Sequence, residues 1–573
     1  MLDALVRQAP SLVEARRLFG ISLRAVGDLT AAERELRAAL ALEPSPQLHE
    51  ALAGTLEDAG RRGEAEAAYR AALALDPMFA AAAIGLSELL LNENRPGEAL
   101  AVIARAAARP DADIHLLSAH ALALKALRRF DEAIAIYRRA VAVAPRSAVA
   151  EHNLAAALGD AELFAEAEAV ARRAFAKGLD APQTWTVLGR ALQGQDRFDE
   201  AERAYRQAIA RRSDDADAQA ELAQLLWMRR GDVQEACVAI DAAIVANPGA
   251  PALKGAKARL LEYAGEPDAA YAALSQALAQ QPDDPRLQTQ ASHLAALSDP
   301  ERALRHAERA AALAPDTTES LSVLCLASLA AGRIESAARL AAELRALAPL
   351  DQQAVALQAT AWRLLGDSRY AELHDYETMV RSWTIDTPPG WSSLEGFLAD
   401  LEASLGRRHP LATHPVGQSL RGGTQTQQRL DRSQDPVIRA FFQAIDGPIR
   451  RHMAEIGTGA DPLRARNTGG YAVAGVWSVR LNPGGHHADH LHTRGWLSSA
   501  CYIALPEAIE HGQEGWLRFG RPGVPTQPPL APEHVVKPEP GKLVLFPSYM
   551  WHGTIPFGGD APRLTIAFDL VPA

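Results

Sequence analysis

Apolar residues recur three or four positions apart, at helical spacing, through the first 365 residues of the chain. The pattern repeats: four-residue segments with the pattern Phe-(Asp/Ala)-Glu-Ala begin at Phe130, Phe164 and Phe198, 34 residues apart. Prolines fall close to the same register, at Pro44, Pro77, Pro110, Pro145, Pro248, Pro282, Pro315 and Pro349. An amphipathic helical hairpin cannot bury its apolar face alone, so neighbouring hairpins stack. The pattern predicts about ten stacked hairpins over residues 1–365, the first and last irregular.

A 34-residue unit of two helices, with small residues where they cross and a proline near the junction, resembles the tetratricopeptide repeat. The resemblance implies an all-α superhelix. Because such arrays commonly bind extended ligands on their surface, we expect a protein or peptide partner on this region. A generic alanine-rich helical bundle is the alternative interpretation, but it leaves the fixed period unexplained.

The pattern changes near residue 370, and six of the nine tryptophans lie beyond that point. Helical periodicity continues around Leu394–Leu405 and Pro436–Ile456, separated by a turn-rich segment over His409–Thr426. After residue 470 the period shifts to two, which predicts strands. The expected strands are Val476–Leu481, Ser498–Leu505, Gly515–Phe519, Lys542–Phe546 and Leu564–Val571. We therefore expect a second domain over residues 366–573, with a closed or double-layered β core at about 470–573 and flanking helices.

Composition and charge narrow the class of protein. A chain of 573 residues with 48% hydrophobic and 23% charged residues is globular and too long for one core. A net charge of −11 argues against nucleic acid as a partner. The three cysteines, Cys237, Cys325 and Cys501, are far apart and form no C-x-x-C pair, which favours a reducing compartment. With no secretory signal and no apolar run long enough for a bilayer, we expect a cytoplasmic protein with no membrane partner.

Histidines concentrate in the C-terminal part of the chain. Residues i and i+2 of a strand point the same way, so His490 and His492 can both reach one ion. His552 follows the buried-looking run Leu543–Phe546 and would come from a neighbouring strand. Three protein ligands on one side of a metal leave the opposite side open for a co-substrate and dioxygen. A histidine-rich surface loop without metal is the alternative interpretation.

Two longer motifs carry a resemblance. Residues 490–502 read H-L-H-T-R-G-W-L-S-S-A-C-Y, residues 541–552 read G-K-L-V-L-F-P-S-Y-M-W-H, and Arg563-Leu-Thr565 opens the last expected strand. Over about residues 470–573 the chain resembles a bacterial and phage family of 2-oxoglutarate/iron(II) oxygenases. The resemblance implies a double-stranded β-helix, or jelly roll, that uses Fe(II), 2-oxoglutarate and dioxygen.

The same resemblance assigns roles to individual residues. His490, His492 and His552 would bind the metal. Arg563 would pair with the distal carboxylate of 2-oxoglutarate, which suits the planar, permanently charged guanidinium. Thr565 and Tyr502 would add hydrogen bonds to that carboxylate.

The third metal ligand has alternatives. Most such oxygenases use H-x-D/E, whereas the aligned pair here is His490 and His492. His487-Ala-Asp489 fits H-x-D three residues earlier and obeys the same spacing rule, so spacing alone does not choose. A mixed set completed by Asp489 or water is a further alternative, and an all-histidine set is more typical of cupin dioxygenases that need no oxoglutarate. We favour His490 and His492, because their distance to Leu497-Ser498 matches the family.

The leading hypothesis is a 2-oxoglutarate- and Fe(II)-dependent dioxygenase that hydroxylates a protein or peptide recruited by the repeats. The joined domains also resemble the aspartyl/asparaginyl β-hydroxylase architecture, an analogy at the level of architecture alone. The alternative is a non-catalytic repeat scaffold with a degenerate oxygenase domain. A glycosyltransferase or sulfotransferase ranks below both, since neither a phosphate-binding glycine loop nor a βαβ pattern is present.

Two further groups of residues are of interest. Arg421 could hold an anion, and Gly422-Gly423 after it permits close backbone approach. Trp496, Trp516 and Trp551 are candidates for the pocket wall, although core packing suits each of them.

Overall fold

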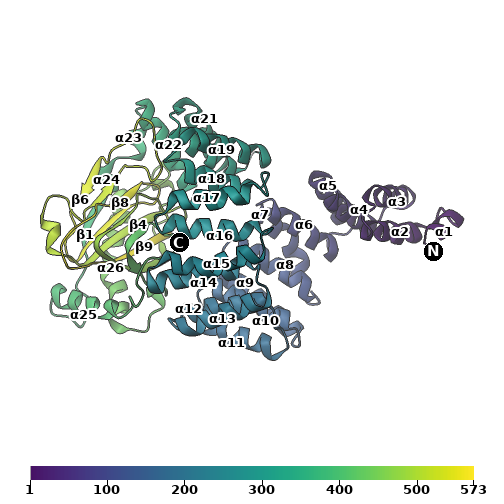
Figure 1. Ribbon diagram of the computed structural model, residues 1–573, viewed down its shortest axis with the longest axis horizontal. Coiled ribbons are helices and arrows are strands. Elements are labelled where there is room, and N and C mark those ends of the chain that lie inside the picture. The colour runs from purple at the N-terminus through teal and green to yellow at the C-terminus, as the bar shows by residue number, and fades with distance from the viewer. Residues whose placement is uncertain (1, 316) are drawn as a thin grey trace. The chain divides into compact units, whose positions relative to one another are not determined.

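The computed structural model describes residues 2–315 and 317–573, which divide into two compact units at residue 194. The first unit, purple to blue in Figure 1, consists of helices packed in antiparallel hairpins such as α2 with α3 and α4 with α5. Its helices are α1 (Leu2–Gln8), α2 (Val13–Ala25), α3 (Leu29–Leu42), α4 (Pro46–Asp58), α5 (Arg62–Leu75), α6 (Ala80–Asn92), α7 (Pro96–Ala107), α8 (Ile114–Ala126), α9 (Phe130–Val143), α10 (Ala148–Asp160), α11 (Phe164–Ala176) and α12 (Pro182–Gln193).

The second unit begins with more hairpins of the same kind. These helices are α13 (Phe198–Arg211), α14 (Ala216–Arg230), α15 (Val233–Ala246), α16 (Pro251–Tyr263), α17 (Pro267–Leu278), α18 (Pro285–Ala295), α19 (Pro300–Leu313), α20 (Thr318–Ala330), α21 (Ile334–Leu347) and α22 (Gln352–Leu365). No helix within residues 2–315 and 317–573 has the length and apolar character that a bilayer crossing needs.

In most hairpins one residue takes a left-handed backbone conformation, in the turn that joins the two helices. These residues recur about every 34 positions, with the α18–α19 turn left out: Gly27, Gly60, Asn94, Arg128, Glu162, Asp196, Gly231, Gly265 and Gly332; Gly366 takes the same conformation at the end of α22. Glycine adopts this conformation without steric cost, which explains its frequency there. The sequence period is thus the period of the turn, and the predicted repeat array is confirmed.

The second unit continues into a β domain with a large and a small antiparallel sheet. The large sheet has the order β1-β7-β4-β9-β3-β2 and the small sheet the order β6-β5-β8. The strands are β1 (Arg381–Thr384), β2 (Leu420–Gln425), β3 (Tyr471–His487), β4 (Leu497–Ala504), β5 (Leu517–Phe519), β6 (His534–Val536), β7 (Lys542–Pro547), β8 (His552–Thr554) and β9 (Arg563–Pro572). This is the predicted jelly-roll architecture.

Short helices and two long ones flank the sheets. The long ones are α25 (Leu394–Gly406), which contacts β4, and α26 (Pro436–Ile456), which contacts β1 and β7, close to the predicted bounds. The others are α23 (Tyr370–Leu373), α24 (Tyr376–Met379), η1 (Leu430–Arg432), η2 (Arg464–Arg466) and η3 (Glu507–Glu510). In Figure 1 the strands lie between α25–α26 on one side and α22–α24 on the other.

The last repeat helix, α22, shares its core with the jelly roll. Val355, Ala356 and Ala359 belong to the same buried cluster as the strand residues of β4, β7 and β9. The indole of Trp551 donates to the Thr360 hydroxyl at 3.1 Å. The guanidinium of Arg363 donates to the carbonyls of Gly520 and Ala531, at 2.6 and 2.8 Å, and pairs with Glu533. A domain boundary at residue 365 therefore divides a single apolar core between the repeats and the jelly roll.

Several strands lack a clear sequence signal. β2 lies inside the segment expected to be turn-rich, and β1, β6 and β8 are only three or four residues long. β2 contains Gly422 and Gly423, and the backbone does approach closely there: a Cβ on Gly423 would lie 2.3 Å from the Arg480 carbonyl oxygen. Glycine has low strand propensity, so the sequence did not predict β2, the strand at this edge of the large sheet.

Candidate metal centre and co-substrate pocket

Two backbone connections bring the three candidate histidines together. His490 and His552, which opens β8, exchange backbone N–H···O hydrogen bonds of 2.9 Å in both directions. The backbone N–H of His492 donates to the Ser548 carbonyl at 3.0 Å, just before β8. The expectation that His490 and His492 share a strand was wrong in detail, because β3 stops at His487 and a single bridge holds His490.

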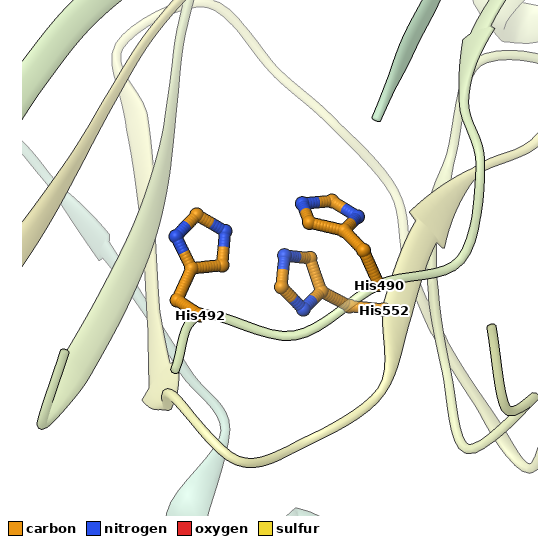
Figure 2. A group of neighbouring side chains, drawn as sticks. All are labelled: His490, His492 and His552. Atoms are coloured by element: carbon orange, nitrogen blue, oxygen red, sulfur yellow. The ribbon is translucent and has the colours of Figure 1, made fainter. Parts of the chain in front are cut away.

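The three imidazoles surround one space, as Figure 2 shows. One ring nitrogen from each of His490, His492 and His552 lies within 4.8 Å of the others. The ring centroids are 4.3 Å apart for His490 and His552, 5.0 Å for His490 and His492, and 5.1 Å for His492 and His552. Three nitrogens at this spacing are able to share one ion after small side-chain rotations.

Hydrogen bonds select the tautomer of each ring. Nδ1 of His490 lies 2.8 Å from the Ala488 carbonyl, and Nδ1 of His552 lies 2.9 Å from the Met550 carbonyl. Nδ1 of His492 lies 2.7 Å from Oδ2 of Asp569. Since each partner is an acceptor, Nδ1 carries the proton and the lone pair of Nε2 remains for a metal.

Burial keeps the rings of His490 and His552 neutral. It lowers the pKa of His490 to about 3, with the neighbouring His492 as a second cause. Burial and the other imidazoles also lower the pKa of His552 well below its usual value. Neutral imidazole is the form that binds a metal, so protons do not compete for these two nitrogens near pH 7.

Asp569 and two serines support the His492 ring. The Asp569 carboxylate, 9% exposed, also accepts a hydrogen bond from the Ser498 hydroxyl at 2.7 Å, and Ser548 lies 2.9 Å from Ser498. A carboxylate behind a ligating histidine fixes the ring and raises its basicity. Sequence reasoning missed Asp569, although its place two strand periods after Thr565 was a usable signal.

Asp489 and His487, the alternative ligands, are engaged elsewhere. The Asp489 carboxylate receives two hydrogen bonds of 2.8 Å from Arg518 and one of 2.6 Å from Nε of Arg521. Nδ1 of His487 lies 2.9 Å from the Ser419 hydroxyl, whose oxygen is also 3.2 Å from Nε2 of His490. The geometry therefore gathers His490, His492 and His552 and turns the Asp489 carboxylate toward two arginines.

A cavity of about 460 Å³ opens beside the three histidines. Arg563 and Thr565 line it from β9. Arg563 is 2% exposed, has no hydrogen-bond partner for Nε, and has no Asp or Glu at ion-pair distance within the described residues. Burial lowers its pKa. A buried guanidinium without a carboxylate is costly and is a fitting site for an anionic ligand.

Tyr502 lies behind Arg563. The guanidinium carbon of Arg563 is 5.0 Å from the centre of the Tyr502 ring, and Tyr502 is fully buried with no hydrogen-bond partner for its hydroxyl. Burial raises the pKa of that hydroxyl, and Arg563 opposes the shift. Tyr502 is thus placed to hold the arginine by its ring.

The aromatic wall of the cavity is Trp477 from β3. Its ring stacks on His492 at 6.0 Å between centroids and 7° between planes. The three tryptophans considered from the sequence pack in the protein instead. Their indoles donate to Leu463 (Trp496), Ile509 (Trp516) and Thr360 (Trp551).

Comparison with known families agrees with this geometry. A family model described as "Putative 2OG-Fe(II) oxygenase" matches residues 475–569. Tetratricopeptide-repeat models match residues 50–113, 114–147 and 186–251. The chain joins tetratricopeptide repeats to an oxygenase-family domain. The oxygenase-family match includes His490, His492, His552, Arg563 and Asp569.

Three solved structures illustrate the likeness of the chain to known structures. A structure of pilF from Pseudomonas aeruginosa is 18% identical and covers 36% of this chain and 95% of its own, with a TM-score of 0.32. A tetratricopeptide repeat protein from Parabacteroides merdae is 15% identical, with coverages of 43% and 97% and a TM-score of 0.34. The Cut9–Hcn1 hetero-tetramer of the APC/C is 15% identical, with coverages of 63% and 79% and a TM-score of 0.30. A comparison with curated proteins gave no match.

Proposed function

We propose that the oxygenase domain is a 2-oxoglutarate- and Fe(II)-dependent dioxygenase that hydroxylates a protein or peptide recruited by the repeats. The observation that carries this proposal is the combination, in one cavity, of three converging imidazoles and a buried arginine that has no carboxylate partner among the described residues. A metal alone would not need the arginine, and an anion site alone would not need three oriented histidines.

The donor set suits iron(II). His490, His492 and His552 would hold the ion through Nε2, because each Nδ1 is committed to an acceptor. These ligands are neutral, and Asp569 supplies a negative charge from behind His492. That arrangement compensates in part for the missing carboxylate ligand.

The opposite end of the cavity suits 2-oxoglutarate. Arg563 would bind its distal carboxylate through a charge-assisted pair, and the Thr565 hydroxyl on the same strand face would add a hydrogen bond. Tyr502 would hold the guanidinium from behind. When bound, iron and 2-oxoglutarate supply the activation of dioxygen that breaks a C–H bond. Trp477 and Phe546, which line the cavity, would help to exclude water from that step.

A polypeptide is the substrate class that this architecture favours. Tetratricopeptide repeats generally mediate protein–protein interactions, and the helices of the second unit reach the cavity through Tyr263. A scaffold that has lost catalysis is the second candidate. Iron binding distinguishes the two candidates, because a site that has lost catalysis is not expected to bind iron through three oriented imidazoles.

Anaerobic titration tests the proposal directly. Purified protein is loaded with Fe(II), and 2-oxoglutarate is added while the visible charge-transfer absorption of the chelate is recorded. We expect a band for the wild type and for Asp489→Asn. His552→Ala should lose iron and the band, whereas Arg563→Gln should keep iron and require more 2-oxoglutarate. No iron binding, or iron without a band, contradicts the proposal.

A further inference from the structure

The cavity is lined by a second arginine that has no Asp or Glu among the described residues within ion-pair distance. Arg421 of β2 lines the cavity and is partly buried, and burial lowers its pKa. One terminal nitrogen, Nη1, donates to the carbonyls of Gln418 and Leu420 at 2.7 and 2.8 Å. Nε and Nη2 have no protein acceptor within the described residues, and no Asp or Glu there lies at ion-pair distance.

An aromatic residue of a repeat helix lies beside Arg421. The guanidinium carbon of Arg421 lies 5.1 Å from the centre of the Tyr263 ring, at the end of α16. Tyr263 also lines the cavity. An aromatic face within about 6 Å of a cation holds it by electrostatic attraction and leaves its edge free for hydrogen bonds.

The loop before β2 fixes this contact. The indole of Trp227 in α14 donates to the His414 carbonyl at 2.9 Å, and Nε2 of His414 lies 2.9 Å from the carbonyl of Tyr263. The backbone N–H groups of Ala412 and Thr413 both donate to the Met228 carbonyl. Arg421 and Tyr263 are therefore held together by the fold and do not meet by chance at the surface.

Glu262, beside Tyr263 in α16, attracts the guanidinium of Arg421 electrostatically, but no Asp or Glu among the described residues, Glu262 included, lies within ion-pair distance of it. Among the described residues that line the cavity, Asp489 is the one acid, and Arg518 and Arg521 already pair with it. In the proposed function, 2-oxoglutarate uses one carboxylate at the metal and the other at Arg563. Neither carboxylate is left for Arg421.

We propose that Arg421 and Tyr263 form a substrate subsite that binds a carboxylate of the polypeptide to be hydroxylated, which deepens and rests on the function proposed above. The carboxylate lies beside Arg421 and accepts hydrogen bonds from its Nε and Nη2. An acidic side chain and a chain-terminal carboxylate share this chemistry. The repeat helix α16 thereby takes part in selecting the residue that enters the pocket.

Peptide binding tests the subsite without turnover. Full-length protein is loaded with Mn(II) and 2-oxoglutarate, and the paramagnetic broadening of peptide NMR signals is measured. The probes are capped pentapeptides, acetyl-Ala-Ala-Xaa-Ala-Ala-amide, with Asp, Glu, Asn or Gln at the centre. An alanine pentapeptide with a free C-terminal carboxylate reports on the terminal source.

The wild type should bind the acidic or the free-terminus peptides more tightly than the amide controls, and whichever is favoured identifies the source of the carboxylate. Arg421→Gln should weaken that binding roughly ten- to a hundredfold, the loss expected for a charged hydrogen bond, and leave the amide peptides unchanged. Tyr263→Ala should weaken it, and Tyr263→Phe, which keeps the ring, should not. Arg439→Gln, at an exposed arginine of α26, is the matched control.

Two results would overturn the subsite. One is equal binding of acidic and amide peptides by a wild type and an Arg421→Gln protein with the same thermal unfolding. The other is loss of the 2-oxoglutarate absorption band in Arg421→Gln while Arg563→Gln keeps it, because Arg421 would then bind the co-substrate. Failure of the oxygenase proposal looks different: the iron-loaded wild type would show no band on adding 2-oxoglutarate, whereas the peptide preference is measured with Mn(II) in place of iron and does not depend on that band.

Discussion

Replacement of Asp489 by asparagine tests whether its carboxylate stabilises the fold through ion pairs or binds the metal. Asp489 is the one acidic candidate for the metal in the sequence motif, and its side chain is 2% exposed. Asparagine keeps the shape but loses the charge and one acceptor. It would leave the guanidinium of Arg518, itself 10% exposed, without its bidentate partner.

The magnitude follows from burial. Removing one partner of a buried ion pair costs about 3–5 kcal/mol, because the other charge stays buried and uncompensated. The second pair, with Arg521, adds little, since that side chain is 47% exposed and screened by solvent. Asparagine retains one hydrogen-bond acceptor, so we expect a loss of about 2–4 kcal/mol in the free energy of unfolding of the second unit.

Two measurements on the same protein check this reasoning. Urea unfolding at pH 7, followed by tryptophan fluorescence, gives the stability change, and anaerobic iron binding to folded protein gives the metal stoichiometry. We expect lower stability with one iron retained. A double variant, Asp489→Leu with Arg518→Leu, should be less destabilised than the sum of the single changes.

The opposite pattern would refute the argument. If Asp489→Asn unfolds like the wild type and binds no iron, the carboxylate is a metal ligand and the arginine contacts are secondary. The ligand set would then be the H-x-D alternative, with His487 and Asp489.

Asp569→Asn should lower iron affinity about 10- to 100-fold, measured by competition with a chelator, because His492 loses its charged acceptor; unchanged affinity would mean that the carboxylate does not orient the ring. Stability should fall as the pH drops from about 6.5 toward 4, since burial lowers the pKa of His409 to about 4 and the unfolded chain then binds more protons than the folded one. His409→Gln should make that pH dependence shallower by up to about 1.4 kcal/mol per pH unit, and equal slopes in urea melts would count against this origin. Gly423→Ala should destabilise the β2 edge by more than about 2 kcal/mol, seen as faster amide exchange in β2, because its Cβ would meet the Arg480 carbonyl at 2.3 Å; wild-type exchange would show that the strand can move aside.

The regular parts of the fold could be predicted from the sequence because they obey a period. The 34-residue period predicts the repeats. Helix α26 begins and ends where its apolar pattern does. The strands β4, β7 and β9 are marked by runs of apolar residues, and they are buried along most of their length. The short strands have no such signal: β8 has three residues, and its pairing with β5 depends on contacts between distant segments.

The site was partly predictable for the same reason. His490, His492, His552, Arg563 and Thr565 lie in compact motifs, and the structure brings them to one cavity. Trp477 and Tyr263 also line that cavity, but they lie outside these motifs and no local pattern marks them. Asp569, behind His492, has one local signal, its strand spacing from Thr565. The choice between His492 and Asp489 also depended on distant residues, because Arg518 and Arg521 decide where the Asp489 carboxylate points.

The shared core of α22 and the jelly roll restricts how the two domains can recombine during evolution. If the oxygenase domain were exchanged onto another repeat array at residue 365, Val355, Ala356 and Ala359 would be left behind and their partners in the jelly roll uncovered. The Trp551 indole and the Gly520 carbonyl would lose their partners as well. Recombination at this point is therefore disfavoured, and the terminal repeat and the oxygenase are expected to be inherited as one piece, with compensating substitutions on both sides of the shared core.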